Sequence, residues 1–514
     1  MKSVNQFARR YVSLVCAIAL IATSLAHAVA QKPATAKRAI THKDYDNWHS
    51  IQSPQISRDG KFVAYAYTGQ DSDGEIVVRS LSGGTEWRAA RGYRPPTPPP
   101  DDPGAATGEF QTNQGRLIRP VFTADAHFVV FTIEPTKADL NKARKEKKRP
   151  DDMPKNALGI MDLSNGQVAR VERVKNFQVP EDAGGFIAYA MEAKPGASPN
   201  REATDTAPKE PPAAPEQLQD EDDVAQRPQG GGGARPASRG PRKEYGTDLI
   251  IRNLTTGTER TISDVLDYSF SKDAKTLAYT VSSKNEETNG VYILSPQSDA
   301  APTALLAGKG KYQKLTWDDD QTELAFISDR DDQASKQAKF KIYLWERGSA
   351  TPVAGGNPTV REGANVRENH ANALPAPIAT EIVSTSSPGF RKDFVVSSQA
   401  NLSFSLDGSH LFLGAAPPPE PEKNADDDLP ADEKVMVDLW HWKDDYIQPI
   451  QKVRAEQERN RSYRAAYDVK AKKFVQLADE KMENLQPSTD GRMAIGTDNR
   501  AYRVTSDYDP GLTD

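Results

Sequence analysis

Alternating apolar and polar positions recur along the chain in units that predict β-hairpins. The first unit, SPQISRDGKFVAYAYTG, runs from Ser53 to Gly69 and has an alternating segment on each side of a turn. Asp and Ser side chains can bond their own backbone two residues on, and Gly60 tolerates the positive φ that a tight reversal needs. The run FVAYAY is rich in β-branched and aromatic residues, which is typical of a strand buried on both faces.

Weaker copies of this unit follow, so that seven aspartates mark seven predicted turns. These are Asp59, Asp125, Asp182, Asp273, Asp320, Asp407 and Asp490. Gly408 and Gly491 repeat the glycine of the first turn. A second hairpin follows most copies, as in LGIMDLSNGQVARV. Two hairpins make one four-stranded sheet, and such sheets repeating along a chain are typical of propeller blades.

The spacing of the copies agrees with blades that are separated by insertions. Asp273 and Asp320 lie 47 residues apart, within the roughly 40–50 residues of a propeller blade. The other intervals are longer and contain tracts rich in Pro, Gly or charged residues, which we expect to be disordered at about residues 91–115, 137–155, 193–244, 354–380 and 415–433. The prediction is an all-β fold over residues 41–514, a β-propeller of about seven four-stranded blades, or eight if incompletely closed.

One segment departs from the strand pattern. From Asp444 to Tyr463 the composition is helical after Pro449, with Ile450 and Val453 among charged residues. We interpret it as a short helix or extended arm that joins a strand, VMVDLWHWK, to the next hairpin. A solvated connector is favoured over a helix that binds a partner.

The first thirty residues predict a signal peptide for export. Lys2, Arg9 and Arg10 precede an apolar run, and AHAVA offers cleavage after Ala28 or Ala30. An uncleaved N-terminal anchor is the alternative. Residues 31–40 are expected to be flexible, and the protein to be periplasmic or secreted with no membrane attachment after cleavage. The single cysteine, Cys16, lies in the signal, so disulfides and thiolate metal sites are excluded from the mature chain.

Composition adds exclusions rather than an activity. The chain has 514 residues and a net charge of −6, with 37 prolines, 34 glycines and 37% hydrophobic residues. This composition favours short strands and many turns over long helices. Basic residues are scattered and do not gather on an aromatic-rich segment, so we expect no nucleic-acid partner. The oligomeric state is left open.

The motifs that could carry chemistry are weak. We therefore assign no catalytic, cofactor-binding, metal-binding or substrate-binding residue, and we expect no cofactor. The chain has no Gly-x-Ser-x-Gly pentapeptide, which an α/β-hydrolase needs for its nucleophile. Outside the signal the histidines are isolated, and none belongs to a His-Glu-x-x-His motif. They are His42, His49, His127, His370, His410 and His441.

Several residues that suggest a site have simpler interpretations. His441 lies between Trp440 and Trp442 and could line a ligand groove, but a structural role on an outer strand is favoured. Metal binding by turn aspartates such as Asp59, Asp273 and Asp407 is disfavoured because their turn role explains them. The triplets at residues 318–320 and 426–428 are interpreted as solvated charge, and the glycines at 230–233 as a flexible linker.

Two blocks of sequence carry a family resemblance. The entry DYDNWHSIQSPQISRDGKFVAYAY and the block VDLWHWKDDYIQPIQKVRAEQERNRSYRAAYDVKAKKFVQLAD resemble exported bacterial serine peptidases of the prolyl-oligopeptidase family, including dipeptidyl-peptidase-like and acylaminoacyl-peptidase-like enzymes. The resemblance runs from about Ala39 to the end of the chain. The Ser-x-Asp-Gly hairpin is shared with other propellers, whereas LWHWKDDYIQP is more specific.

The resemblance implies a gating role without catalysis. In that family an N-terminal propeller of seven or eight blades caps a C-terminal α/β-hydrolase domain with a Ser-Asp-His triad. The match here covers only the propeller, so this chain alone is expected to be inactive and a fragment of a longer enzyme. Its expected partners are peptides or a hydrolase domain encoded downstream. The alternative is a free-standing periplasmic propeller that binds a protein or peptide.

Overall fold

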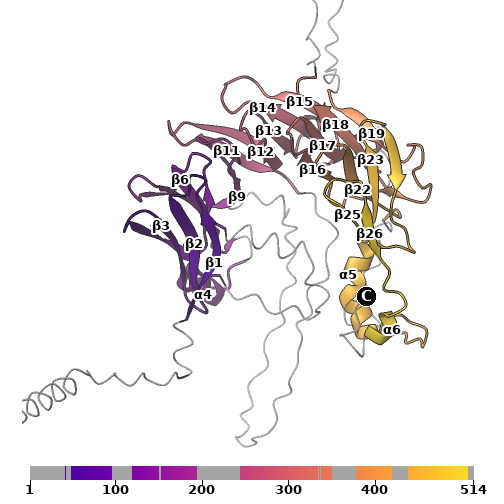
Figure 1. Cartoon of the computed structure of the whole chain (residues 1–514), viewed down its shortest axis with the longest axis horizontal. Coiled ribbons are helices and arrows are strands. Elements are labelled where there is room, and N and C mark those ends of the chain that lie inside the picture. The colour runs from indigo at the N-terminus through magenta and orange to yellow at the C-terminus, as the bar shows by residue number, and fades with distance from the viewer. Residues whose placement is uncertain are drawn as a thin grey trace, which may run out of the picture.

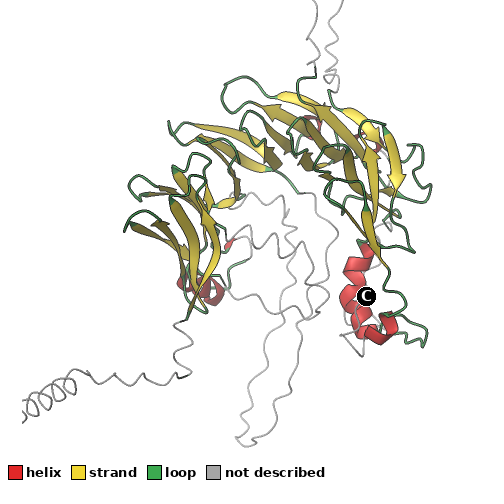
Figure 2. Ribbon diagram, in the orientation of Figure 1, coloured by secondary structure: helices red, strands yellow, loops and turns green. Residues whose placement is uncertain are grey.

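The regular structure of the described part of the chain is mainly β-strand, with few helices. The structure, a computed structural model, describes residues 41, 48–94, 119–149, 152–193, 244–349 without 334 and 336, 378–419 and 438–506. Antiparallel sheets follow one another along an open arc, with sheet β1–β4 at one end and hairpin β25–β26 near the other (Figures 1 and 2). The predicted export signal, residues 31–40 and the insertion at 193–244 except its first and last residues lie outside the described residues.

Each of the first two sheets is a meander of four strands. Sheet 1 contains β1 (His49–Ile56), β2 (Phe62–Gly69), β3 (Gly74–Ser80) and β4 (Glu86–Gly92). Sheet 2 contains β5 (Val121–Phe122), β6 (Phe128–Ile133), β7 (Ala157–Asp162) and β8 (Val168–Val171). All neighbouring strands are antiparallel, as hairpin connections require.

Sheets 3 and 4 share one long strand. Sheet 3 contains β9 (Val174–Gln178), β10 (Phe186–Met191), β11 (Thr247–Asn253) and the first half of β12 (Glu259–Phe270). Sheet 4 contains the second half of β12 with β13 (Leu277–Val281), β14 (Gly290–Leu294) and β15 (Thr303–Ala307). Val265 pairs with both Thr247 of β11 and Val281 of β13, and Asp264 just before it has a positive φ of 60°. The outermost strand of one sheet thus continues as the innermost strand of the next.

The remaining strands form two further sheets and a hairpin. Sheet 5 contains β16 (Tyr312–Trp317), β17 (Glu323–Ser328), β18 (Lys341–Glu346) and β19 (Thr380–Val383). Sheet 6 contains β20 (Val395–Val396), β21 (Ser403–Phe404), β22 (His410–Ala416), β23 (Tyr463–Asp468) and β24 (Lys473–Gln476). The terminal hairpin is β25 (Asn484–Pro487) with β26 (Ala494–Thr497). The predicted all-β fold of propeller blades is confirmed, and the number of blades stays a prediction.

The repeated turn is held by a hydroxyl and a carboxylate two residues apart. Ser57 Oγ donates a hydrogen bond of 2.6 Å to Asp59 Oδ1, which also accepts from the Lys61 N–H at 3.1 Å. The Phe62 N–H donates back to Ser57 Oγ at 2.9 Å. The turns at Asp125, Asp273, Asp407 and Asp490 repeat all three bonds. The predicted turn role of these aspartates is confirmed.

The sheets are joined by apolar side chains from both faces of each second strand. In β6, Val129 and Phe131 pack with sheet 1, whereas Val130 packs with sheet 3. In β10, Ile187 belongs to the core shared with sheet 2 and Ala188 to the core shared with sheet 4. Successive side chains of a strand point to opposite faces, so one strand serves two interfaces. The core is therefore a series of layers between sheets.

Two connections between the described strands contain α-helices. Helix α5 (Gln448–Arg459) confirms the predicted helix, with Pro449 in its first turn. The expectation of disorder at 137–155 is wrong for α4 (Lys137–Lys145), whose first turn is capped by Thr136. The described part of the predicted strand VMVDLWHWK, from Asp438 onward, is also not a strand. A last short helix, α6, is Arg503–Ser506. No described helix is long and apolar enough to cross a membrane.

The turn glycines give a test of backbone strain. Gly60 has a φ of +71°, and a Cβ there would meet no atom within 4 Å. Gly60→Ala should therefore lower the free energy of unfolding by about 1 kcal/mol through left-handed strain alone. Gly84 is equally unobstructed but lies outside the left-handed region, so Gly84→Ala is the matched control. Equal urea midpoints for the two variants would contradict the strain argument.

The turn carboxylates should make the fold sensitive to acid. Hydrogen bonds from Ser57, Ser405 and Ser488 lower the pKa of the aspartate two residues on. Burial acts to raise the pKa of Asp273, but the bond from Ser271 and its other partners outweigh it and lower the pKa to about 2. A depressed folded pKa stabilises the fold above the unfolded value of about 3.9, and this contribution is lost as the pH falls through the folded value.

We expect the free energy of unfolding to decrease from about pH 4 to pH 2 as these aspartates are protonated. Removing the bond to Asp273 with Ser271→Ala should lower stability at pH 7 and reduce this acid-dependent loss. Urea unfolding at pH 7 and pH 3 measures both effects, with Ser82→Ala as an exposed-serine control. An acid-dependent loss in Ser271→Ala as large as that of the unaltered chain would refute the linkage.

Candidate functional site

One polar residue recurs six residues before each turn aspartate, within the innermost strand or, for Arg119 and Asn401, two residues before a strand. The first strands of the sheets, such as β1, β9 and β16, lie along the concave side of the arc (Figure 1). The residues at this position are Ser53, Arg119, Asn176, Asp267, Lys314, Asn401 and Asn484, all of them exposed or half-buried. The residue that follows each from the third unit onward is apolar and packs into a core. The sequence therefore builds a polar concave wall.

Hydrogen bonds between neighbouring sheets run along this wall. Arg119 Nη2 donates to Gln55 Oε1 at 2.5 Å, which joins sheets 2 and 1. The Tyr268 hydroxyl donates to Asn176 Oδ1 at 2.8 Å, which joins sheets 4 and 3. Lys314 Nζ donates to Asn401 Oδ1 at 2.8 Å, which joins sheets 5 and 6. The wall thus contains three separate hydrogen bonds, each of which joins two neighbouring sheets.

Lys314 reaches Asn401 on the next sheet because the backbone of β16 is irregular. The pairing of β16 with β17 shifts between Gln313 and Thr316, and Lys314 has a positive φ of 63°. Such a bulge re-aims a side chain at the cost of local strain. Asp267 on the preceding sheet stays accessible to solvent but lies deep among the inner strands. Burial there raises its pKa, and Lys314 and Lys175 act in the opposite direction. The wall thus carries charges of both signs.

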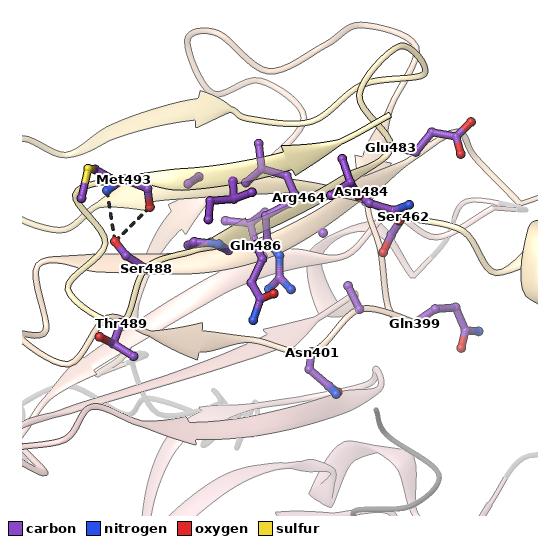
Figure 3. Close-up of a pocket in the computed structure, with 18 residues that line it drawn as sticks. Gln399, Asn401, Ser462, Arg464, Glu483, Asn484, Gln486, Ser488, Thr489 and Met493 are labelled. Carbon is purple, nitrogen blue, oxygen red and sulfur yellow. Dashed lines mark hydrogen bonds between the residues drawn. The ribbon is translucent and has the colours of Figure 1, made fainter. Parts of the chain in front are cut away.

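A cavity opens where sheet 6 meets the terminal hairpin. Its volume is about 1200 Å³, and it is lined by residues 399–401, 413–414, 462, 464, 483–489, 493–495 and 497. Figure 3 shows Arg464 and Gln486 near its centre and Glu483 at its edge. Two wall residues, Asn401 and Asn484, also line it. The cavity is therefore continuous with the polar concave wall.

Only two of the lining residues are charged, and one of them is already neutralised. Glu483 accepts hydrogen bonds from Arg461 at 2.9 Å and from Arg503 at 2.7 Å. Arg464 is half-buried and makes no ion pair or side-chain hydrogen bond with any described residue. An arginine side chain keeps its positive charge in proteins. The cavity therefore contains one uncompensated guanidinium.

The structure does not bring the histidines of the described segments together. His49 stacks on Tyr67 with ring centroids 4.6 Å apart, and His127 lies 3.4 Å from Asp125 on an exposed turn. His441 is exposed in a turn where its ring accepts from the Lys443 N–H, so the expected outer-strand position is wrong. His42 and His370 lie outside the described residues. Within the described segments no three His, Cys, Asp or Glu side chains are placed to hold a metal ion.

A serine–histidine contact occurs in the sixth turn, but its geometry belongs to the turn. Ser409 Oγ lies 2.7 Å from His410 Nδ1 and also donates to Asp407 Oδ1 at 2.7 Å. A serine is activated when a histidine accepts its proton and a carboxylate orients that histidine. Here the carboxylate accepts the serine proton itself. The arrangement stabilises the turn and supplies no activated nucleophile.

The acidic triplet at residues 318–320 is not simply solvated charge, as the sequence analysis expected. Asp318 is not solvated: only 4% of its surface is exposed. Its carboxylate accepts from the N–H groups of Thr322 and Glu323 at 2.8 and 2.7 Å. It takes the place of the turn serine, two residues before Asp320. The triplet at 426–428 and the glycines at 230–233 lie outside the described residues.

The sequence-based search missed Lys314 and Arg464. Neither residue belongs to a catalytic motif, and each looks like an ordinary charged residue in a strand. The available signal for Lys314 was positional, because it lies six residues before its turn aspartate, whereas the position of Arg464 follows only from its pairing with Gly414. A search for motifs alone does not use that register.

Comparisons with known proteins give distant structural likenesses only. No family model and no curated protein matches the chain. The tricorn protease is similar at 13% identity and a TM-score of 0.33, over 88% of this chain and 33% of that chain. A prolyl endopeptidase is similar at 13% identity and a TM-score of 0.35, over 86% and 45%.

A third similar structure is the β-propeller domain of the Trilobed protease from Pyrococcus furiosus. Its identity is 7% and its TM-score 0.32, over 86% of this chain and 89% of that chain. The present chain spans less than half the length of the first two proteins. Likenesses this distant assign no activity.

Proposed function

We propose that this chain is the non-catalytic propeller portion of an exported serine peptidase of the prolyl-oligopeptidase kind, and that its concave wall filters the peptides that reach a hydrolase domain. The observation that carries the proposal is the repeated polar position on the concave side. Asn, Asp, Lys and Arg side chains there offer donors and acceptors to a peptide backbone without a fixed sequence preference. The resemblance of the LWHWKDDYIQP block to such peptidases supports the same assignment.

The wall suits transient contact better than tight binding. Its polar groups come from successive sheets and are spread along the arc, so no single anchor dominates. Several of them, such as Arg119 and Lys314, already bond neighbouring sheets at 2.5 and 2.8 Å. A peptide must exchange with those bonds, which offsets much of the gain on binding. Weak and distributed contacts are what a filter requires.

A free-standing binding protein is the second candidate, and exposed apolar side chains just before α5 are compatible with it. Leu439, Trp440 and Trp442 are 77%, 63% and 85% exposed just before α5. Aromatic side chains are enriched where proteins meet. The same surface could equally meet a hydrolase domain, so the two candidates need a test that separates them.

The test combines reactivity with gene context. The purified chain should not react with a fluorophosphonate probe for activated serines, under conditions that label a known serine hydrolase. The DNA after codon 514 should encode a Gly-x-Ser-x-Gly motif followed by Asp and His. In that longer protein, Lys314→Ala should change kcat/KM for long peptides relative to dipeptide substrates. Unrelated downstream DNA would favour the binding protein, and labelling of the present chain would overturn both candidates.

A further inference from the structure

The cavity beside the terminal hairpin results from substitutions at positions that are apolar in the other sheets. Each turn aspartate fixes a register, so equivalent residues can be compared from sheet to sheet. The second strand presents its residues four and six after the aspartate to the preceding sheet; in the third copy, one extra residue adds one to these distances. The third strand presents one residue to the following sheet. This residue pairs with the second-strand residue that lies seven after the aspartate. These positions decide how closely two sheets pack.

Large apolar residues occupy the positions on the second strands of sheets 2 to 6. They are Val129 and Phe131, Ile187 and Tyr189, Leu277 and Tyr279, Leu324 and Phe326, and Leu411 and Leu413, all at most 2% exposed. The terminal hairpin has Ala494 and Gly496 there instead. The side chain of Met482 lies against Gly496 and takes up part of the space. The hairpin therefore presents a small face to sheet 6.

The facing position on sheet 6 is also exceptional. In sheets 1 to 5 the residue on the third strand is aliphatic and fully buried against the next sheet. These residues are Ile76, Leu158, Leu249, Val291 and Ile342. In sheet 6 the equivalent residue, paired with Gly414, is Arg464. The same interface thus loses two large side chains on one side and gains a cation on the other.

We propose that this cavity is a binding site for the carboxylate of a peptide. Arg464 supplies planar donors that match a carboxylate, and Glu483 cannot compensate it because Arg461 and Arg503 already hold that side chain. Gln399 and Asn401 add amide groups, and Leu413 and Ala494 add apolar surface. The volume of about 1200 Å³ exceeds the usual upper range of about 1,000 Å³ for small-ligand pockets, which favours several peptide residues over a small acid.

The carboxylate can come from a peptide C-terminus or from an acidic side chain, and the guanidinium binds both in the same way. This inference goes beyond the proposed function and does not depend on it. It rests on the cavity and on Arg464, whereas the filter rests on the inner strands. A peptide can bind here whether or not a hydrolase domain exists.

The test measures binding of three N-acetylated pentapeptides to the full chain by isothermal titration calorimetry, so that no label adds a charge. One is AVAVA with a free C-terminus, the second is its C-terminal amide, and the third is the amide AVEVA with a central glutamate. At least one carboxylate-bearing peptide should bind about tenfold more tightly than the neutral amide, the factor expected of a charge-assisted pair. Which of the two binds identifies the source of the carboxylate. Equal affinity for all three peptides would overturn the proposal.

Variants test the residues involved. Arg464→Ala should remove the preference for the carboxylate, and Arg464→Lys should keep part of it because the charge remains. Arg492→Ala is the control, since Arg492 is exposed and lies outside the cavity. Ala494→Leu restores the residue of the equivalent strands and should fill the space, so that binding falls while thermal stability is kept or raised. Unchanged binding in folded Arg464→Ala, verified by circular dichroism, would refute the site.

Discussion

Face-to-face packing of one sheet on the next is the interaction on which this structure depends. A four-stranded meander has two faces and no enclosed core of its own, so it becomes stable only when neighbours cover it. Val129 and Val130 show how this is arranged, because adjacent residues of β6 pack with the sheets before and after it. Stability is therefore distributed along the chain, and any change at one interface acts locally.

The hydrogen-bonded turn at each aspartate supports this packing by fixing where each second strand begins. Ser57 and Asp59 together accept and donate the hydrogen bonds that hold the reversal, and four other turns repeat them. A slip of one residue would reverse the two faces of the strand and place its core residues on the wrong interface. The hydrogen-bonded turn therefore fixes the register of the second strand. It also explains why aspartates that look like potential ligands are engaged in structure.

We expect functional sites where the chain departs from this regular packing of sheets. Except for β12, which sheets 3 and 4 share, the innermost strands pair along one edge only, and on this inner side the sequence is polar at a fixed position. At the terminal hairpin the apolar interface itself changes, since Arg464 replaces an aliphatic residue and Ala494 and Gly496 replace large ones. Regular packing provides the background against which these departures become visible. A motif search starts from catalytic signatures and does not detect them.

The sequence by itself determined the local structure: the alternation of the strands, the turn at each aspartate and the helix after Pro449. These features depend on neighbours within a few residues, so they can be predicted without knowing the fold. The sequence did not reveal helix α4, the burial of Asp318 in its turn, or the position of His441 in an exposed turn. Only the tertiary structure showed that Lys314 reaches Asn401 and that Arg464 faces a cavity, because both facts depend on which sheets stand side by side.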